Sequence, residues 1–139
     1  MRTAIDTNIL SALWGKEASA ERIAEFLYEA GGQGALVLSP IVYVEARAHP
    51  NVSEEAMHRF LETNRVVVDW SPGQPVWMLA AERFEQQVTR RRRQLASGQR
   101  RFPADFLVGA HALLQADRLV TLDQRVYRAD FPELILVEL

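Results

Sequence analysis

The chain has 139 residues, no cysteine and a formal net charge of −2. This length suits one domain, residues 1–139, whose core needs no metal or disulfide staple. The lack of cysteine excludes disulfide frameworks, thiolate zinc sites and cysteine nucleophiles, and no apolar run approaches the roughly 18 residues that a membrane span needs. We therefore expect a soluble, cytoplasmic protein with no membrane segment.

The first predicted element is a short buried strand over residues 3–5, which ends at Asp6. In an open α/β sheet, ligands bind in the crevice outside the carboxyl ends of the strands. Asp6 is therefore a candidate site residue. The alternative is that Asp6, Thr7 or Asn8 only caps the helix that follows, since all three side chains accept hydrogen bonds from free N–H groups.

Another helix and a strand come next. Apolar residues at helical spacing predict an amphipathic helix over residues 19–30, and the Gly31-Gly32 pair predicts a left-handed stop directly after it. Residues 35–38 form a second buried strand in this interpretation. Ser39 is then expected to cap the next helix, with Pro40 at its first position, where a missing N–H costs nothing.

The second half of the chain alternates in the same way. Its expected elements are helices from Ser53, from Pro75 and over residues 102–116, and strands over residues 66–68, 119–121 and 134–137. The helix over residues 102–116 is apolar around much of its circumference and should be central. Strands that alternate with helices predict an α/β fold, a three-layer α/β/α sandwich with a mostly parallel sheet of four or five strands.

Three acids besides Asp6 stand at unusual places. Glu45 is the only acid in an apolar helix, and its side chain can reach back toward the sheet edge. Asp105 lies in the first turn of the most apolar helix, and Asp123 directly follows a strand, as Asp6 does. Each has an ordinary alternative: a solvent-facing Glu45, a favourable first-turn Asp105, a turn residue at Asp123. Their joint placement at one side of the sheet predicts a site.

Clustered carboxylates repel one another, and their charge is costly to bury unless cations compensate it. Hard oxygen ligands favour Mg²⁺ or Mn²⁺. Two such ions about 3.5–4 Å apart can activate a water and stabilise the leaving oxygen of a phosphodiester. The cluster thus indicates nuclease chemistry, which needs no histidine. His49, His58 and His111 lack metal-ligand spacing, and we expect them to be surface or packing residues.

Four segments, taken in their order along the chain, resemble the PIN domain, most closely the VapC-type toxin ribonucleases of prokaryotic toxin–antitoxin systems. The segments are Asp6-Thr7-Asn8, Val44-Glu45-Ala46, the run from Pro103 to Ala112 that contains Asp105, and Thr121-Leu122-Asp123. Together they cover essentially the whole chain. The resemblance implies a Rossmann-like sheet, an Mg²⁺- or Mn²⁺-dependent endoribonuclease that uses metal-activated water, a homodimer, and a small cognate VapB-like antitoxin.

The resemblance also assigns roles to residues. It implies that one or two metal ions and the catalysis depend on Asp6, Glu45, Asp105 and Asp123, with Asn8 and Thr121 as supporting hydrogen-bonding groups. One position departs from the family pattern. Family members often carry a further acid or Asn about three residues after the Asp123 position, where this chain has Val126. A second metal is therefore expected to be weakly held.

A basic window precedes the helix that bears Asp105. Its candidate RNA- or antitoxin-binding residues are Arg90, Arg91, Arg92, Arg93, Arg100 and Arg101. Arginine binds phosphate bidentately, and a basic rim near the acidic site would attract RNA. The alternatives are a solvated helix end that complements the helix dipole and a surface for an acidic antitoxin tail. Four consecutive arginines cannot all face one way on a helix, so some should only be solvated.

Two other functions compete with the nuclease. One is a catalytically weak PIN-like module that binds RNA or protein and acts through its partner, and the complete set of four acids argues against it. The other is a phosphatase with Asp6 as nucleophile, as in haloacid-dehalogenase-like enzymes. Those enzymes need a second Asp two residues on, and this chain has Asn8 there with no obvious supporting lysine. The sequence leaves the RNA target open.

Overall fold

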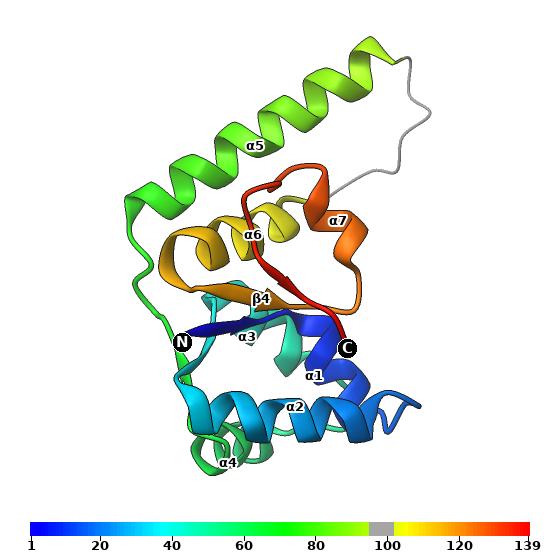
Figure 1. The fold of residues 1–139 in the computed structure, drawn as a ribbon, viewed down its shortest axis with the longest axis vertical. Coiled ribbons are helices and arrows are strands. Elements are labelled where there is room, and N and C mark those ends of the chain that lie inside the picture. The colour runs from blue at the N-terminus through cyan, green and yellow to red at the C-terminus, as the bar shows by residue number, and fades with distance from the viewer. Residues whose placement is uncertain (95–101) are drawn as a thin grey trace.

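A computed structural model describes residues 1–94 and 102–139. It is an α/β fold in which helices flank a parallel sheet (Figure 1). In chain order the elements are β1 (Thr3–Ile5), α1 (Thr7–Trp14), α2 (Ala20–Gln33), β2 (Leu36–Leu38), α3 (Pro40–Arg47), α4 (Glu54–Thr63), β3 (Val66–Val68), α5 (Gln74–Arg93), α6 (Pro103–Gln115), β4 (Arg118–Val120), α7 (Gln124–Arg128) and β5 (Leu136–Val137). No helix within the described residues is both long and apolar enough to cross a membrane.

The sheet has five strands in the order β3-β2-β1-β4-β5, and its paired strands are parallel. Thr3 of the central strand β1 is paired with Leu36 on one side and with Arg118 on the other. The chain therefore builds β2 and β3 outward from one side of β1 and β4 and β5 outward from the other. In a sheet of this kind, a ligand crevice opens at the carboxyl ends of the two neighbouring strands from which the chain builds outward in opposite directions. Here those strands are β1 and β4, which confirms the predicted parallel α/β architecture.

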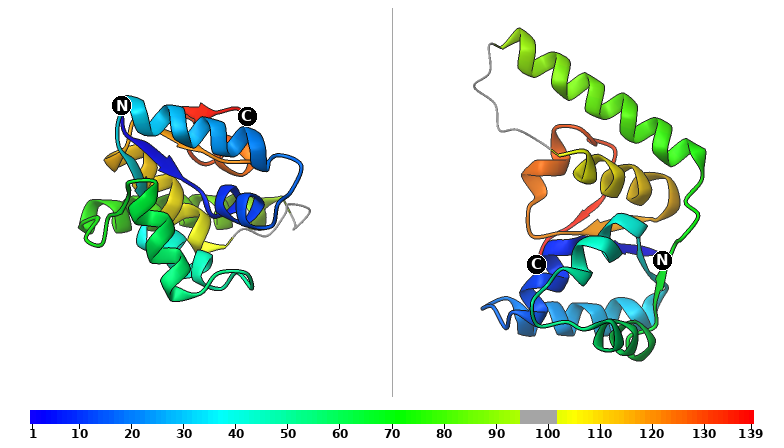
Figure 2. Two further views of the ribbon diagram at one scale, coloured as in Figure 1. Left: turned by 90° about the horizontal axis from the view of Figure 1, so that it is seen from below. Right: turned by 180° about the vertical axis from the view of Figure 1, so that it is seen from behind.

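The core lies on both faces of the central strands. α2 lies on one side of β1 and α6 on the other, as the front view in Figure 1 and the view from behind in Figure 2 both show. Ile5 and Leu36 are each only 1% exposed because helices cover both faces. α6 buries Phe106, Ala110 and Ala112 completely, which confirms its predicted central position.

The predicted end of the second helix is wrong. α2 continues through Gly31 and Gly32 to Gln33, and the Gly34 N–H donates to the Ala30 carbonyl at 3.0 Å. Each glycine costs a helix up to about 1 kcal/mol relative to alanine, and the burial of the α2 face that contains Leu27 and Ala30 outweighs this cost. The position that requires a glycine is Gly34, directly after α2. A Cβ at Gly34 would lie 1.8 Å from the Met1 carbonyl oxygen, so only glycine allows the terminus to pass so closely.

The helix caps follow the sequence only in part. The Ser53 hydroxyl accepts a hydrogen bond from the Ala56 N–H at 3.1 Å, as expected for an N-cap. Ser39 occupies the N-cap position of α3, yet its hydroxyl makes no capping bond and has no partner among the described residues. Asp6 does cap α1, because its Oδ1 accepts from the Thr7 N–H at 2.7 Å. The short helix α7 has no counterpart among the elements expected from the sequence.

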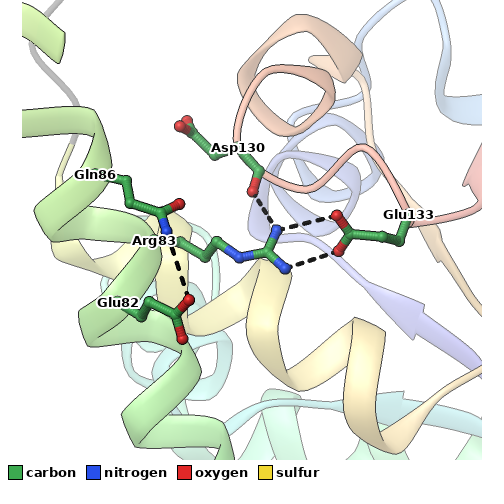
Figure 3. A network of polar contacts seen from close by, with 5 residues as sticks. All are labelled: Glu82, Arg83, Gln86, Asp130 and Glu133. Carbon is green, nitrogen blue, oxygen red and sulfur yellow. Dashed lines mark hydrogen bonds and ion pairs between the residues drawn. The ribbon is translucent and has the colours of Figure 1, made fainter.

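The long helix α5 lies beside α6, and its C-terminal end extends away from the sheet (Figure 1). It is fastened to the segment that follows α7. The Arg83 guanidinium donates to the Asp130 carbonyl at 2.7 Å and to the Glu133 carboxylate at 2.8 Å, as Figure 3 shows. This connection joins α5 to the chain that leads into β5.

Candidate active site

An open cleft of about 510 Å³ lies at the carboxyl ends of β1 and β4. All four predicted acids, which come from four separate parts of the chain, line it. The described residues around the cleft are Asp6, Thr7, Asn8, Ser11, Glu17, Glu45, Asp105, Leu122, Asp123, Val126 and Tyr127. The structure therefore brings the candidate acids together at the carboxyl ends of β1 and β4, where the strand order reverses.

The backbone explains why these acids meet. Asp6 ends β1 and caps α1, and its backbone N–H donates to the Val120 carbonyl of β4 at 3.1 Å. Asp123 follows β4 and is the N-cap residue of α7. Glu45 lies in α3, and Asp105 in the first turn of α6. Strand ends and helix beginnings share one edge of a parallel α/β sheet, so this edge collects Asp6, Asp105 and Asp123. Glu45 lies in the second half of α3 and reaches this edge through its side chain, which Thr7 of α1 contacts.

A hydroxyl connects the ends of β1 and β4. Thr121 Oγ1 donates to Asp6 Oδ2 at 2.8 Å, and it accepts from Asn8 Nδ2 and from the Asp123 N–H, both at 3.1 Å. Asn8 also accepts a bond from the Leu122 N–H at 3.1 Å. Thr121 thus hydrogen-bonds Asp6 directly, whereas Asn8 bonds Thr121 and the Leu122 N–H, and the two residues fix the segment that leads to Asp123.

Asp6 is the most buried of the four acids. Its exposed fraction is 8%, and burial raises the pKa of its carboxyl group above the ordinary value. The negative charge of Asp105 raises this pKa further, whereas the hydrogen bonds from Tyr127, Thr121 and the Thr7 N–H oppose the rise. A cation bound nearby would stabilise the ionised form of a carboxylate in this environment.

Glu45 shares this electrostatic environment. Thr7 Oγ1 donates to Glu45 Oε1 at 2.8 Å, which ties α3 to the beginning of α1. Partial burial raises the pKa of Glu45, the charges of Asp6 and Asp105 raise it further, and the Thr7 hydrogen bond opposes them. The charges of Asp6 and Asp105 are therefore close enough to Glu45 to raise its pKa.

Two residues that line the cleft have no signal in the sequence. Glu17, in the loop after α1, adds a fifth carboxylate to the cleft, and no strand end or helix pattern marks it. Tyr127 donates from its hydroxyl to Asp6 Oδ2 at 2.8 Å although 121 residues separate the two in the chain. Neither residue carries a local sequence pattern that predicts its place in the site.

The donor set of the cleft suits a hard divalent cation. Five carboxylates line it, from Asp6, Glu17, Glu45, Asp105 and Asp123. Within residues 1–94 and 102–139, no three acidic or histidine side chains are already spaced as a complete metal site. Mg²⁺ needs no such cage, because it keeps several waters and binds through one or two carboxylates and substrate phosphates. The residues present therefore fit Mg²⁺ or Mn²⁺.

The histidines stand apart from this cleft, as expected. His111 is 1% exposed, and its Nε2 lies 3.1 Å from Asp69 Oδ2. Burial lowers the pKa of His111, and the Asp69 hydrogen bond and charge oppose this shift. His49 packs edge-on against Trp14, and His58 lies beside Tyr43. All three are packing or surface residues.

The described part of the arginine window does not line the cleft. Arg90 forms an ion pair with Asp130, whose side chain is 1% exposed, and Arg91 is half-buried. Arg92 and Arg93 are exposed at the end of α5. Arg100 and Arg101 fall outside the described residues. The four consecutive arginines therefore differ in environment, as helical geometry requires.

Comparison with known proteins gives one family and several related folds. The model of the PIN domain family matches residues 3–132. VapBC2 from Rickettsia felis, solved bound to a DNA fragment from its promoter, is similar with a TM-score of 0.64 and 20% identity over 99% of this chain and 98% of that chain. VapBC-1 from nontypeable Haemophilus influenzae gives a TM-score of 0.64 and 22% identity over 99% and 98% of the two chains.

A third similar structure is FitAcB from Neisseria gonorrhoeae, with a TM-score of 0.62 and 18% identity over 98% of this chain and 96% of that chain. At such identities the likeness establishes the fold alone. No curated protein matches the chain by sequence.

Proposed function

The chain belongs to the PIN domain family, and on this premise we propose that it is an Mg²⁺- or Mn²⁺-dependent endoribonuclease. One observation carries the proposal: Asp6, Glu45, Asp105 and Asp123 converge on one cleft, at the carboxyl ends of β1 and β4 where the strand order reverses. Such acids are costly to gather unless a cation is to be bound among them. The family supplies the reaction class, and the cleft supplies the residues.

The four acids would hold one or two cations. Bound there, the metal supplies water activation and stabilisation of the leaving oxygen of a phosphodiester. The chain's own groups prepare the ligands: Thr121 orients Asp6, and Thr7 orients Glu45. Val126 lines the cleft with a side chain that cannot bind metal, so any second ion depends on the remaining acids and on substrate phosphate.

We also propose that the protein is the toxin of a VapBC-type module with a small antitoxin partner. The similar folds named VapBC2, VapBC-1 and FitAcB, which match this chain over nearly their full length, support this assignment. The exposed end of α5, with Arg92 and Arg93, suits RNA phosphates or an acidic antitoxin segment. If a small gene is found beside the gene of this chain, gel filtration and calorimetry with its product would test the partner, and the absence of a complex would contradict it.

A homodimer is the proposed assembly. Large apolar side chains are exposed on α3, after β3 and at the beginning of α5, with exposed fractions of 61% for Val44, 62% for Trp70, 56% for Trp77 and 62% for Met78. Trp70 packs against Tyr43 of α3 with ring centroids 4.9 Å apart. Sedimentation of the purified chain should give twice the monomer mass, and a monomeric mass at all concentrations would contradict the dimer.

The decisive experiment is cleavage of RNA by the purified chain and three variants. Asp6→Asn and Asp105→Asn should abolish cleavage with the fold intact by circular dichroism, because each removes a metal ligand of the cleft. Glu62→Gln, an exposed acid of α4, is the matched control and should cleave like the parent. Full cleavage by both Asp variants, or in excess EDTA, would exclude the metal mechanism. Binding of RNA without cleavage would instead support the catalytically weak binding module.

A further inference from the structure

Tyr127 connects the short helix α7 to the acidic cleft. Its side chain is buried, with 1% exposed, and its hydroxyl donates to Asp6 Oδ2 at 2.8 Å. It also lines the cleft itself. A buried tyrosine usually finds a partner for its hydroxyl, and here that partner is the most buried acid of the site. The contact therefore concerns the chemistry of Asp6 as well as core packing.

The hydrogen bonds on Asp6 are divided unequally between its two oxygens. Oδ2 accepts from Thr121 Oγ1 and from the Tyr127 hydroxyl, both at 2.8 Å. Within residues 1–94 and 102–139, Oδ1 accepts from the Thr7 N–H alone, at 2.7 Å. Each carboxylate oxygen offers about two lone-pair positions. Both positions on Oδ2 are thus filled, and Oδ1 retains one that is open.

We propose that Tyr127 is a positioning residue that occupies Oδ2 of Asp6 and so directs a divalent cation to Oδ1. This inference rests on the proposed function, because it concerns the ligand geometry of the same cleft. Groups that hydrogen-bond a metal ligand fix its orientation, and their loss typically weakens metal affinity 10- to 100-fold. Tyr127 and Thr121 approach the same oxygen from α7 and from the end of β4, so together they hold the carboxylate in one rotation.

Tyr127 is itself held from two helices. The Phe131 N–H donates to the Tyr127 carbonyl at 2.7 Å, and the Phe131 ring fits over Gly109 of α6, where a Cβ would lie 2.4 Å from the ring. From α5, Arg83 donates to the Asp130 carbonyl and Arg90 pairs with the Asp130 carboxylate (Figure 3 shows the Arg83 contacts). These contacts fix the end of α7, which is too short to be stable alone.

The test is Mn²⁺ affinity, measured by electron paramagnetic resonance titration of the purified chain without RNA. Tyr127→Phe keeps the ring and removes only the hydroxyl, and we expect its Mn²⁺ dissociation constant to rise at least tenfold. Tyr28→Phe is the matched control, because Tyr28 is 85% exposed and should bind Mn²⁺ like the parent. Thr121→Val should weaken binding in the same way, and Thr121→Ser, which keeps the donor, should restore it.

Melting curves in EDTA separate positioning from packing. A lower melting temperature of Tyr127→Phe with an unchanged Mn²⁺ dissociation constant would assign the residue to the core alone and overturn the proposal. The proposed function fails differently. In that case the parent binds no Mn²⁺, or Asp6→Asn binds it as tightly as the parent.

Discussion

Arg90, the first of four consecutive arginines, forms an ion pair with Asp130, whose side chain is 1% exposed. Two turns earlier on the same helix, Arg83 donates to the carbonyl of Asp130 and to the carboxylate of Glu133. The described part of the basic window, Arg90 to Arg93, therefore has two parts. Its beginning fastens α5 to the segment that positions α7, and Arg92 and Arg93 at its end are exposed.

The first prediction separates these parts by stability. Arg90→Gln should lower the free energy of unfolding by about 2 kcal/mol, because a buried carboxylate loses a charge-assisted hydrogen bond. Arg93→Gln, its matched control three residues on, should change it by less than about 0.5 kcal/mol, as surface substitutions usually do. Urea unfolding of both variants measures the difference. Equal losses would show that Arg90 is no more structural than Arg93.

The second prediction concerns capture of RNA. Arg92→Gln and Arg93→Gln should weaken RNA binding and flatten its salt dependence, because each arginine that neutralises a phosphate of a single strand contributes about 0.7 to the slope of log affinity against log salt. The turnover number at saturating RNA should be nearly unchanged. Affinity for the antitoxin must be measured in the same variants. An unchanged salt slope with weakened antitoxin binding would assign these arginines to the antitoxin.

The third prediction is a metal-dependent gain in stability. Mg²⁺ or Mn²⁺ should raise the melting temperature of the parent, since a ligand that binds only the folded state stabilises it by roughly 2.7 kcal/mol at a hundred times its dissociation constant. Asp6→Asn should respond little. Differential scanning calorimetry across a metal titration measures both proteins. If both melting temperatures rise equally, the ion binds outside the acidic cleft.

The fourth prediction is the pH dependence of stability without metal. The folded pKa values of Asp6 and Glu45 lie above their ordinary values of 3.8 and 4.5, so the folded protein binds protons more tightly than the unfolded chain. Their stabilising contribution is complete below the ordinary values and is lost as pH rises through the raised pKa values. In EDTA, Asp6→Asn should therefore gain stability over the parent as pH rises from about 4, the ordinary value of an aspartate.

Urea unfolding of the two proteins at each pH, read as variant minus parent, isolates the contribution of position 6 from other titrating groups. Asparagine has nearly the same shape and can still accept from the Thr7 N–H, but its amide nitrogen cannot accept from the Thr121 and Tyr127 hydroxyls as Oδ2 does. The loss of these two bonds does not depend on pH, so the change of the difference with pH reports the charge. A difference that stays constant with pH would mean that Asp6 carries no raised pKa.

The fifth prediction concerns the close approach of α6 to the segment after α7. Gly109→Ala should destabilise the fold by about 1–3 kcal/mol, the usual cost of overpacking, because the new Cβ would lie 2.4 Å from a buried ring atom of Phe131. Gly32→Ala is the matched control within a helix, where nothing lies within 4 Å of the new Cβ. It should stabilise α2 by about 0.5–1 kcal/mol. Thermal denaturation of both variants checks the opposite signs.

The sequence alone determined the alternation of strands and helices, apart from α7, and the positions of the four acids. Both are local properties, since an apolar run fixes a buried strand and its carboxyl end fixes where Asp6 and Asp123 emerge. First-turn Asp105 and Glu45 in an apolar helix follow from helix geometry in the same way. Convergence of these acids could therefore be predicted from the order of the elements.

Only the tertiary structure decided which groups surround those acids. Tyr127 reaches Asp6 across 121 residues, and Arg90 pairs with Asp130 across 40. Such contacts depend on how α5, α6 and α7 pack together, which no periodicity encodes. The same cause extends α2 through its glycines, because burial of the helix face outweighs the local preference to stop. Local patterns fix where a side chain leaves the backbone, and packing fixes what it meets there.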